Sequence, residues 1–469
     1  MGRALLPLLL LAACASVPPV PESASLAHPP APEVIGPHGP LNPAESARVL
    51  EMLAAQAPDP AALRRQIALE QSIAETPLYT GNHIELLSDG EQTLPAIFDA
   101  IRAARQFVHL EYYILEDVTW NGQRLSDLLI DKRRQGVEID MIYDAAGSFS
   151  TPAEFWDRLR AAGVHVVEFN PLSPLRLPFH HSVNDRDHRK IFVVDGTEAI
   201  IGGVNLSSDY ESAPQITPSA GQALSGAVHE NKEGAAAKKP HEPWHDTDVA
   251  IHGPVVLAID ELFRVHWAAQ GGEPLEAGKV VKAERAGDEV VRTIGSSPRV
   301  LVSRYYVAVL SAIHNAQRSI WVTAAYFVPT EQEKQALKAA AQRGVDVRVL
   351  LPSRTDSSAA LAVQHSEYTE LLRAGVRIYE RQGGILHTKA MVIDDVWSII
   401  GSSNFDHRSV LFNDEIDAVT IGEVTAAQFA ALFRRNLAQA KPITLPAWEH
   451  RGTTERMRER FWRLWEVLL

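Results

Sequence analysis

The residues of this chain that could do chemistry stand in two copies of one short pattern. Each copy places a histidine, a lysine two positions later, an aspartate and, after further glycines or serines, an asparagine at identical spacing. The copies are His188, Lys190, Asp195 and Asn205 in the first, and His387, Lys389, Asp394 and Asn404 in the second. Two copies at matched spacing predict a duplicated unit whose two half-sites meet in one active site.

The residue types in this pattern suit a phosphate group. In a strand, residues two apart point to the same face, so each histidine and its lysine are expected to enter one pocket. Lysine supplies positive charge, asparagine supplies an amide donor, and imidazole can act as nucleophile or general base. Lysines beside the imidazoles would repel a metal ion, and no further Cys or His spacing supplies ligands. We therefore expect neither a metal nor a cofactor.

Each imidazole needs an acidic partner that fixes its tautomer. Extending the repeat beyond the two asparagines aligns residues 246–253 with residues 415–422. This alignment nominates Asp246 and Glu415, which are acidic and equivalent. Asp195 and Asp394 stay among the candidate site residues. They follow each histidine by seven positions, beyond an apolar run, so we assign them a structural role.

Strands and helices alternate along the chain, twice in the same order. In the first half we expect strands at 84–87, 107–114, 137–143 and 164–169, with helices at 93–104, 125–135 and 155–162. Residues 319–322, 344–347 and 374–376 repeat parts of this order in the second half. A 46% hydrophobic content allows buried cores. The sequence predicts an α/β fold made of βαβ units with a largely parallel sheet.

These signals divide the chain into five parts. The predicted parts are a signal peptide over 1–14, a tether and helical extension over 15–77, a first α/β domain over 78–271 with an insertion at about 212–243, a linker over 272–296, and a second α/β domain over 297–469. The chain ends in a basic amphipathic segment, residues 449–469. Such a helix can lie on an anionic membrane or pack on the protein's own core, and the sequence leaves both open.

The two motifs resemble the signature of the phospholipase D superfamily. The wider chain is most similar to bacterial cardiolipin synthases, on residues 109–113, 325–329 and 401–409. The resemblance covers roughly residues 78–469. It implies two similar α/β sandwich domains that share one central cleft, a covalent phosphohistidine intermediate and no metal. By similarity, His188 would be the nucleophile and His387 the general acid and base.

The leading functional expectation is phosphatidyl transfer between phospholipids, most simply the synthesis of cardiolipin from phosphatidylglycerol. The first alternative is hydrolysis to phosphatidic acid by the same residues. A nuclease is the second alternative, and the net charge of -13 disfavours it. The third alternative is a membrane-tethered binding protein with an inactive site, against which the two intact motifs argue.

The N-terminus predicts export and lipidation. Arg3 precedes a short leucine-rich run, and Leu-Ala-Ala then leads to Cys14, the one cysteine of the chain. This order resembles a bacterial lipobox, whose cysteine is lipidated; an ordinary export signal is the alternative. We expect a lipoprotein in the bacterial cell envelope, facing the periplasm and held to the membrane by Cys14, with the C-terminal helix as a second candidate for membrane contact. Ala15 favours the outer membrane over the inner.

Overall fold

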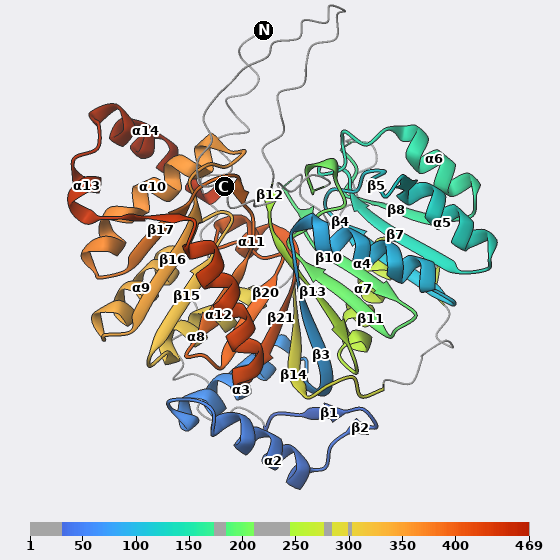
Figure 1. Ribbon diagram of the computed structural model, residues 1–469, viewed down its shortest axis with the longest axis horizontal. Helices are drawn as coiled ribbons and strands as arrows, with labels where there is room; N and C mark the ends of the chain where they lie inside the picture. Colours follow the sequence, from blue (N-terminus) through green and yellow to red (C-terminus); the bar gives the residue numbers. More distant parts are fainter. Residues whose placement is uncertain (1–30, 173–183, 211–243, 276–283, 299–302, 469) are drawn as a thin grey trace, which may run out of the picture.

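The fold is built on one long mixed sheet that runs through both halves of the chain (Figure 1). The structure is a computed structural model in which the described residues are 31–172, 184–210, 244–275, 284–298 and 303–468. Within these residues the sheet has 18 strands, and helices cover both of its faces.

Seven strands form the first half of the sheet. In sheet order they are β8 (His165–Phe169), β7 (Glu138–Asp144), β4 (Phe107–Tyr112), β10 (Lys190–Val194), β11 (Glu198–Gly202), β13 (Thr247–His252) and β3 (Leu78–Ser88). Helices α4 (Asp89–Ala103), α5 (Leu125–Arg134) and α6 (Ala153–Ala161) pack on one face, and α7 (Val256–Ala269) packs on the other.

The second half repeats this arrangement. Its strands, in sheet order, are β14 (Glu289–Ser296), β21 (Asn413–Ile421), β20 (Trp397–Gly401), β19 (Ala390–Ile393), β15 (Ser319–Thr323), β16 (Asp346–Pro352), β17 (Arg377–Arg381) and β22 (Ala440–Ile443). Its helices are α8 (Arg304–Asn315), α9 (Glu331–Gln342), α10 (Ser358–Arg373) and α12 (Glu423–Leu437). The predicted duplication in an α/β fold is therefore confirmed.

The prediction of a largely parallel sheet is wrong. Among the fifteen strands of the two halves named above, only β4, β7 and β8, and their counterparts β15, β16 and β17, pair in parallel in the described residues. Short turns join β10 to β11 and β19 to β20, which makes each pair antiparallel. The next strands, β13 and β21, also pair antiparallel with β11 and β20. Strands β3 and β14 then pair antiparallel with each other and join the two halves.

The motif strands are buried on both faces. In β10, Ile191 and Val193 belong to one apolar cluster, whereas Phe192 and Val194 belong to the cluster on the opposite face. Alternating side chains of one strand therefore anchor it to two helical layers at once. This packing holds the residues at the start of β10, including Lys190, in a rigid frame.

The N-terminal extension packs on the second half. It consists of β1 (Val34–Gly36), β2 (Gly39–Pro40), α2 (Pro43–Ala54) and α3 (Pro60–Ala74), and it lies at the bottom of Figure 1. Glu70 of α3 is fully buried, pairs with Arg292 of β14 at 3.1 Å and accepts a hydrogen bond from Trp397 of β20 at 2.7 Å. The predicted helical extension is thus tied into the core by a buried ion pair.

Several predictions concern other parts of the chain. The predicted linker over 272–296 is partly wrong, because Glu289–Ser296 forms the buried strand β14. The C-terminal segment forms α13 (Leu445–Glu449), α14 (Thr453–Arg463) and a short turn, η4 (Glu466–Leu468). Cys14 with its predicted signal, and the insertion at 212–243, lie outside the described residues. Within the described residues, no helix has the length and apolar character needed to cross a bilayer.

Candidate active site

Each motif histidine is fixed by a segment of the opposite half. The backbone N–H of His188 donates to the carbonyl of Asp414 at 2.9 Å, and that of His387 donates to the carbonyl of His245 at 2.7 Å. Short parallel pairings flank these contacts: β9 (Arg186–Asp187) pairs with β21, and β12 (Trp244–His245) pairs with β18 (Ile385–Leu386). The two halves therefore interlock at the catalytic motifs.

The side chains cross between the halves in the same way. The Nδ1 atom of His188 lies 3.0 Å from Glu415 Oε2, and Nδ1 of His387 lies 2.6 Å from Asp246 Oδ2. The structure thus brings together the histidines and the two acids that the repeat alignment nominated. The alignment does not say which acid serves which histidine, and the structure shows that each histidine is paired with the acid of the opposite half. With Nδ1 held by a carboxylate, Nε2 is the ring nitrogen that can act on a substrate.

Both acids accept further hydrogen bonds besides their contacts with the imidazoles. Glu415 also accepts hydrogen bonds from Ser402, Ser409 and Asn413. Asp246 also accepts from the Tyr210 hydroxyl at 3.2 Å and from the Thr247 N–H at 2.8 Å.

A glycine makes room for the second of these acids. A Cβ atom built on Gly203 would lie 2.2 Å from Asp246 Oδ1, so only glycine fits beside this carboxylate. The orientation of the acids is therefore fixed by groups from their own half.

The lysines and asparagines complete each half-site. Lys190 and Lys389 are buried, and each donates to the carbonyl of its own motif histidine. Asn205 Oδ1 accepts the N–H of Ile114 at 3.1 Å. Asn404 Oδ1 is buried and has no hydrogen-bond partner among the described residues. The ammonium and amide groups are thus positioned to bind the oxygens of a phosphate.

The electrostatics keep both imidazoles neutral. Burial lowers the pKa of His188 to about 4, and the positive charge of Lys190 adds to this effect. Burial and Lys389 likewise lower the pKa of His387. Burial alone would raise the pKa of Glu415, but the imidazole of His188, the positive charge of Lys190 and the hydrogen bond from Ser402 together outweigh it, and the net shift is downward. At neutral pH, each half-site therefore pairs a neutral imidazole with an ionised carboxylate.

We predict a titration that reports this environment. The unfolded chain binds protons on its histidines below about pH 6.5, whereas His188 in the folded protein stays neutral down to about pH 4. Folding stability from this group is therefore lost as the pH falls from about 6.5 to about 4. NMR of ring-labelled histidine should show no titration of His188 between pH 5 and 8, and added inorganic phosphate should raise its pKa. A midpoint near 6.5 in the free protein would contradict the account.

The two half-sites open into one pocket. Its volume is about 250 Å³, and both motif histidines and both asparagines line it. Tyr113 contacts His188 edge-on with ring centroids 5.2 Å apart, and Trp244 lies 4.6 Å from His387 by the same measure. Arg186 and Arg408 add positive charge to the lining. The pocket can therefore accept one phosphate between the imidazoles and an apolar substituent against the aromatic walls.

Asp195 and Asp394 lie outside this pocket. Asp195 accepts backbone N–H groups of Gln106 and Phe107 at 2.7 and 2.9 Å, and Asp394 accepts those of Arg318 and Ser319 at the same two distances. Both residues have positive φ, at 52° and 55°. They tie the turn after each motif strand to the start of the neighbouring strand. This placement agrees with the structural role assigned from the sequence and removes them from the chemistry.

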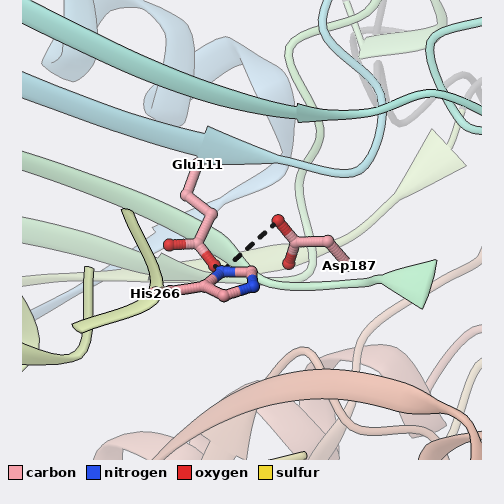
Figure 2. A group of neighbouring side chains, drawn as sticks. All are labelled: Glu111, Asp187 and His266. Carbon is pink, nitrogen blue, oxygen red and sulfur yellow. Dashed lines mark hydrogen bonds and ion pairs between the residues drawn. The ribbon is translucent and has the colours of Figure 1, made fainter. Parts of the chain in front are cut away.

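A buried charged cluster lies behind the first half-site (Figure 2). Ligand atoms of Glu111, Asp187 and His266 lie within 4.8 Å of one another, close enough to hold a metal ion. However, Glu111 Oε1 already contacts His266 Nδ1 at 2.8 Å and Arg189 Nη1 at 3.4 Å. Burial raises the pKa of Glu111 to about 7, and burial beside Glu111 raises that of Asp187. We interpret the cluster as a proton-sharing network that anchors Asp187 and Arg189, the two neighbours of His188.

Several pocket residues were missed from the sequence. Tyr113 and Tyr326 lie in segments that carried the family resemblance, which was the available signal. Arg186 and Trp244 belong to two-residue strands whose partners are in the other half. No local pattern marks such residues, because their contacts are made across the duplicated unit.

Comparison with known proteins identifies the family. The family model "Cardiolipin synthase, PLD-like domain" matches residues 97–213 and 309–437, which together form more than half of the chain. The chain belongs to this family of phospholipase D-like proteins. Each matched segment contains one histidine motif, so the family match coincides with the two interlocked half-sites.

Relatives within the family cover most of the chain. A cardiolipin synthase of Geobacillus sp. (strain WCH70) is 33% identical over 87% of this chain and 76% of its own length. Cardiolipin synthase A of Pseudomonas aeruginosa (strain LESB58) is 33% identical over 79% of this chain and 70% of its own length. Among solved structures, phosphatidylserine synthase of Haemophilus influenzae Rd KW20 superposes with a TM-score of 0.59 at 10% identity, over 86% of this chain and all of that one. This structural likeness concerns the fold.

Proposed function

We propose that this protein is a phosphatidyltransferase that makes cardiolipin from two molecules of phosphatidylglycerol. The names of its relatives support the reaction. The observation that carries the chemistry is the crossed pair of neutral imidazoles, His188 with Glu415 and His387 with Asp246, around one pocket. Two neutral imidazoles can divide the work of a nucleophile and a proton carrier.

In the first step, Nε2 of His188 attacks the phosphorus of one phosphatidylglycerol. The N–P bond forms and the bond from phosphorus to the glycerol oxygen breaks. His387 takes up a proton from solvent as the anionic substrate binds and then gives it to the departing glycerol, and Asp246 stabilises the imidazolium before the transfer. The anionic phosphate raises the proton affinity of His387 when the substrate binds, which offsets the effect of burial.

In the second step, His387 takes the proton from a hydroxyl of the second phosphatidylglycerol. The resulting alkoxide attacks phosphorus, the N–P bond breaks, and cardiolipin leaves with His188 restored to its neutral form. Lys190 and Lys389, each bound to the carbonyl of its motif histidine, supply positive charge beside the imidazoles for the phosphoryl oxygens in both steps. Water in place of the second lipid would give phosphatidic acid by the same path.

The product distinguishes these outcomes. Purified protein would be incubated with vesicles of phosphatidylglycerol, and lipids and released glycerol would be measured. We expect cardiolipin and glycerol in equal amounts, with no product from His188→Ala. Phosphatidic acid as the sole product would replace transfer by hydrolysis, and no lipid turnover together with DNA cleavage would overturn both.

We also propose that lipidation of Cys14 holds the protein at the periplasmic face of the cell envelope, in the outer membrane. Support comes from the order of the first residues, from Arg3 to Ala15. The variant Cys14→Ser should fail to incorporate labelled palmitate, and a high-salt wash should then release it from the membrane fraction while the parent stays bound. Incorporation of palmitate by Cys14→Ser at the parental level would contradict lipidation at this residue.

A further inference from the structure

The C-terminal helix α14 presents three different faces. Glu459 is buried on the face toward the protein, where it pairs with Arg451 at 2.7 Å. The second face carries Arg456, Arg460 and Arg463, at helical spacing. Each of these arginines is followed by a large apolar residue, so a third, apolar face runs beside the basic one.

The basic face lines a groove on the protein surface. The groove has a volume of about 260 Å³ and contains five arginines, Arg373, Arg451, Arg456, Arg460 and Arg463. Its two carboxylates are occupied, because Glu449 pairs with Arg373 at 2.6 Å and Glu459 pairs with Arg451. The groove therefore carries net positive charge, which suits a phosphate group.

The apolar face is exposed. The exposed fractions of Met457, Phe461 and Leu464 are 72%, 56% and 79%. Three large apolar side chains in one stripe, next to a row of arginines, form the pattern of a helix that lies in the interface of an anionic membrane. The structure therefore favours both of the options left open by the sequence, because one face of α14 packs on the protein and another stays free.

Helix α14 runs back along α10 toward the catalytic pocket. Glu449, which precedes α14, pairs with Arg373 at the C-terminal end of α10. Arg463 at the end of α14 pairs with Glu367, closer to the N-terminal end of α10, at 3.4 Å. The following turn, η4, contacts α11 (His407–Leu411), and Arg408 of α11 lines the pocket. Figure 1 shows α14, α11 and β12 in the upper half of the view.

Exposed apolar residues also occur in the first half. Phe149 follows β7 and is 78% exposed, and Leu172 follows β8 and is 47% exposed. Both come after the carboxyl ends of strands that are parallel to β4, and β4 leads directly to Tyr113 in the pocket. The pocket therefore has apolar anchors on both sides.

We propose that α14 docks the side of the protein that carries the pocket onto an anionic phospholipid bilayer. Arg456 and Arg460 bind lipid phosphates through the groove, while Met457, Phe461 and Leu464 enter the acyl boundary. The proposal deepens the proposed function and rests on it in one respect, since a bilayer substrate gives the orientation its purpose. It predicts a second phospholipid site that is separate from the catalytic histidines.

Vesicle sedimentation tests the docking without turnover. The full chain would carry Cys14→Ser, so that no acyl anchor contributes, and His188→Ala, so that the lipids stay intact. We expect it to bind phosphatidylglycerol vesicles at least about tenfold more tightly than phosphatidylcholine vesicles. Adding Met457→Ser, Phe461→Ser and Leu464→Ser should remove most of this binding. Arg456→Gln with Arg460→Gln should remove its salt dependence.

A matched control and a competitor complete the test. Val424 of α12 is 71% exposed but lies outside the stripe, so Val424→Ser should bind as the parent does. Millimolar inorganic phosphate should not release the protein; release by phosphate would mean a site for the free ion. Binding of the stripe variant equal to that of the control would overturn the proposal.

Activity separates this proposal from the proposed function. In the active chain, the stripe variant should turn over a soluble short-chain phosphatidylglycerol at the parental rate and lose activity on vesicles. Cardiolipin formation on vesicles that is insensitive to the stripe variant would sink the docking alone. Stripe-dependent vesicle binding without cardiolipin formation would sink the proposed function alone.

Discussion

Replacing Glu415 with glutamine is expected to lower kcat on the order of 10³- to 10⁴-fold, although Glu415 lies in the opposite half from His188. The amide can still reach Nδ1, but it no longer stabilises the positive imidazole and can hold the wrong tautomer. Asp246→Asn should cost as much through His387. Steady-state rates of cardiolipin formation measure both effects.

A change of leaving group tests which histidine is the nucleophile and which is the general acid. In a phosphatidyl ester of p-nitrophenol, the leaving group is p-nitrophenolate, which departs without a proton. Its release therefore needs little help from a general acid. With this substrate, Asp246→Asn should recover much of the first-step rate, whereas Glu415→Gln should remain slow. The reverse pattern would show that His387 attacks phosphorus.

A buried acid near the site provides the matched control. Burial raises the pKa of Asp417 to about 8, and its carboxyl contacts Ser403 rather than an imidazole. Asp417→Asn therefore replaces one neutral group by another. We expect it to change kcat by less than about tenfold. A loss of kcat as large as that of Glu415→Gln would mean that any change of a buried polar side chain near the pocket disables the site.

Replacing Glu70 with alanine should destabilise the fold by about 3–5 kcal/mol. The change leaves Arg292 buried without its carboxylate and removes the acceptor of the Trp397 N–H. Chemical denaturation followed by tryptophan fluorescence measures the free energy of unfolding. The double variant Glu70→Leu, Arg292→Leu should recover much of the loss, because both charges are then absent.

An exposed glutamate in the same extension serves as the control for Glu70. Glu51 of α2 is exposed, so Glu51→Ala should change the free energy of unfolding by less than about 0.5 kcal/mol. A loss of similar size for both variants would indicate a general effect of helix composition. A loss below 1 kcal/mol for Glu70→Ala would show that the extension is not held by this ion pair.

The residues of each half-site could be predicted from the sequence, but the pairing of each histidine with the acid of the other half could not. The repeat alignment found His188, His387, Asp246 and Glu415 because each copy preserves type and spacing. It could not find the crossing, because equivalent positions are aligned whether an acid serves its own half or the other. That choice depends on how two folded units associate, which is a long-range property.

The sheet shows the same limit. Helix-crossover signals around β4, β7 and β8 predicted parallel strands, and those strands are parallel. The motif strands β10 and β19 are joined to the next strands by short turns rather than helices, so these strands pair antiparallel, which the prediction of a largely parallel sheet overlooked. Trp244 and Arg186 line the pocket because their short strands pair with strands of the other half. Neither periodicity nor composition signals such pairings.

The most direct test of the central claim is to locate the phosphatidyl group during turnover. Phosphatidylglycerol labelled with ³²P would be mixed with excess protein, quenched in alkali within milliseconds and digested. We predict label that is stable to alkali and labile to acid on the peptide containing His188, and none after Glu415→Gln. Label on the peptide containing His387, or turnover without any labelled peptide, would contradict the account.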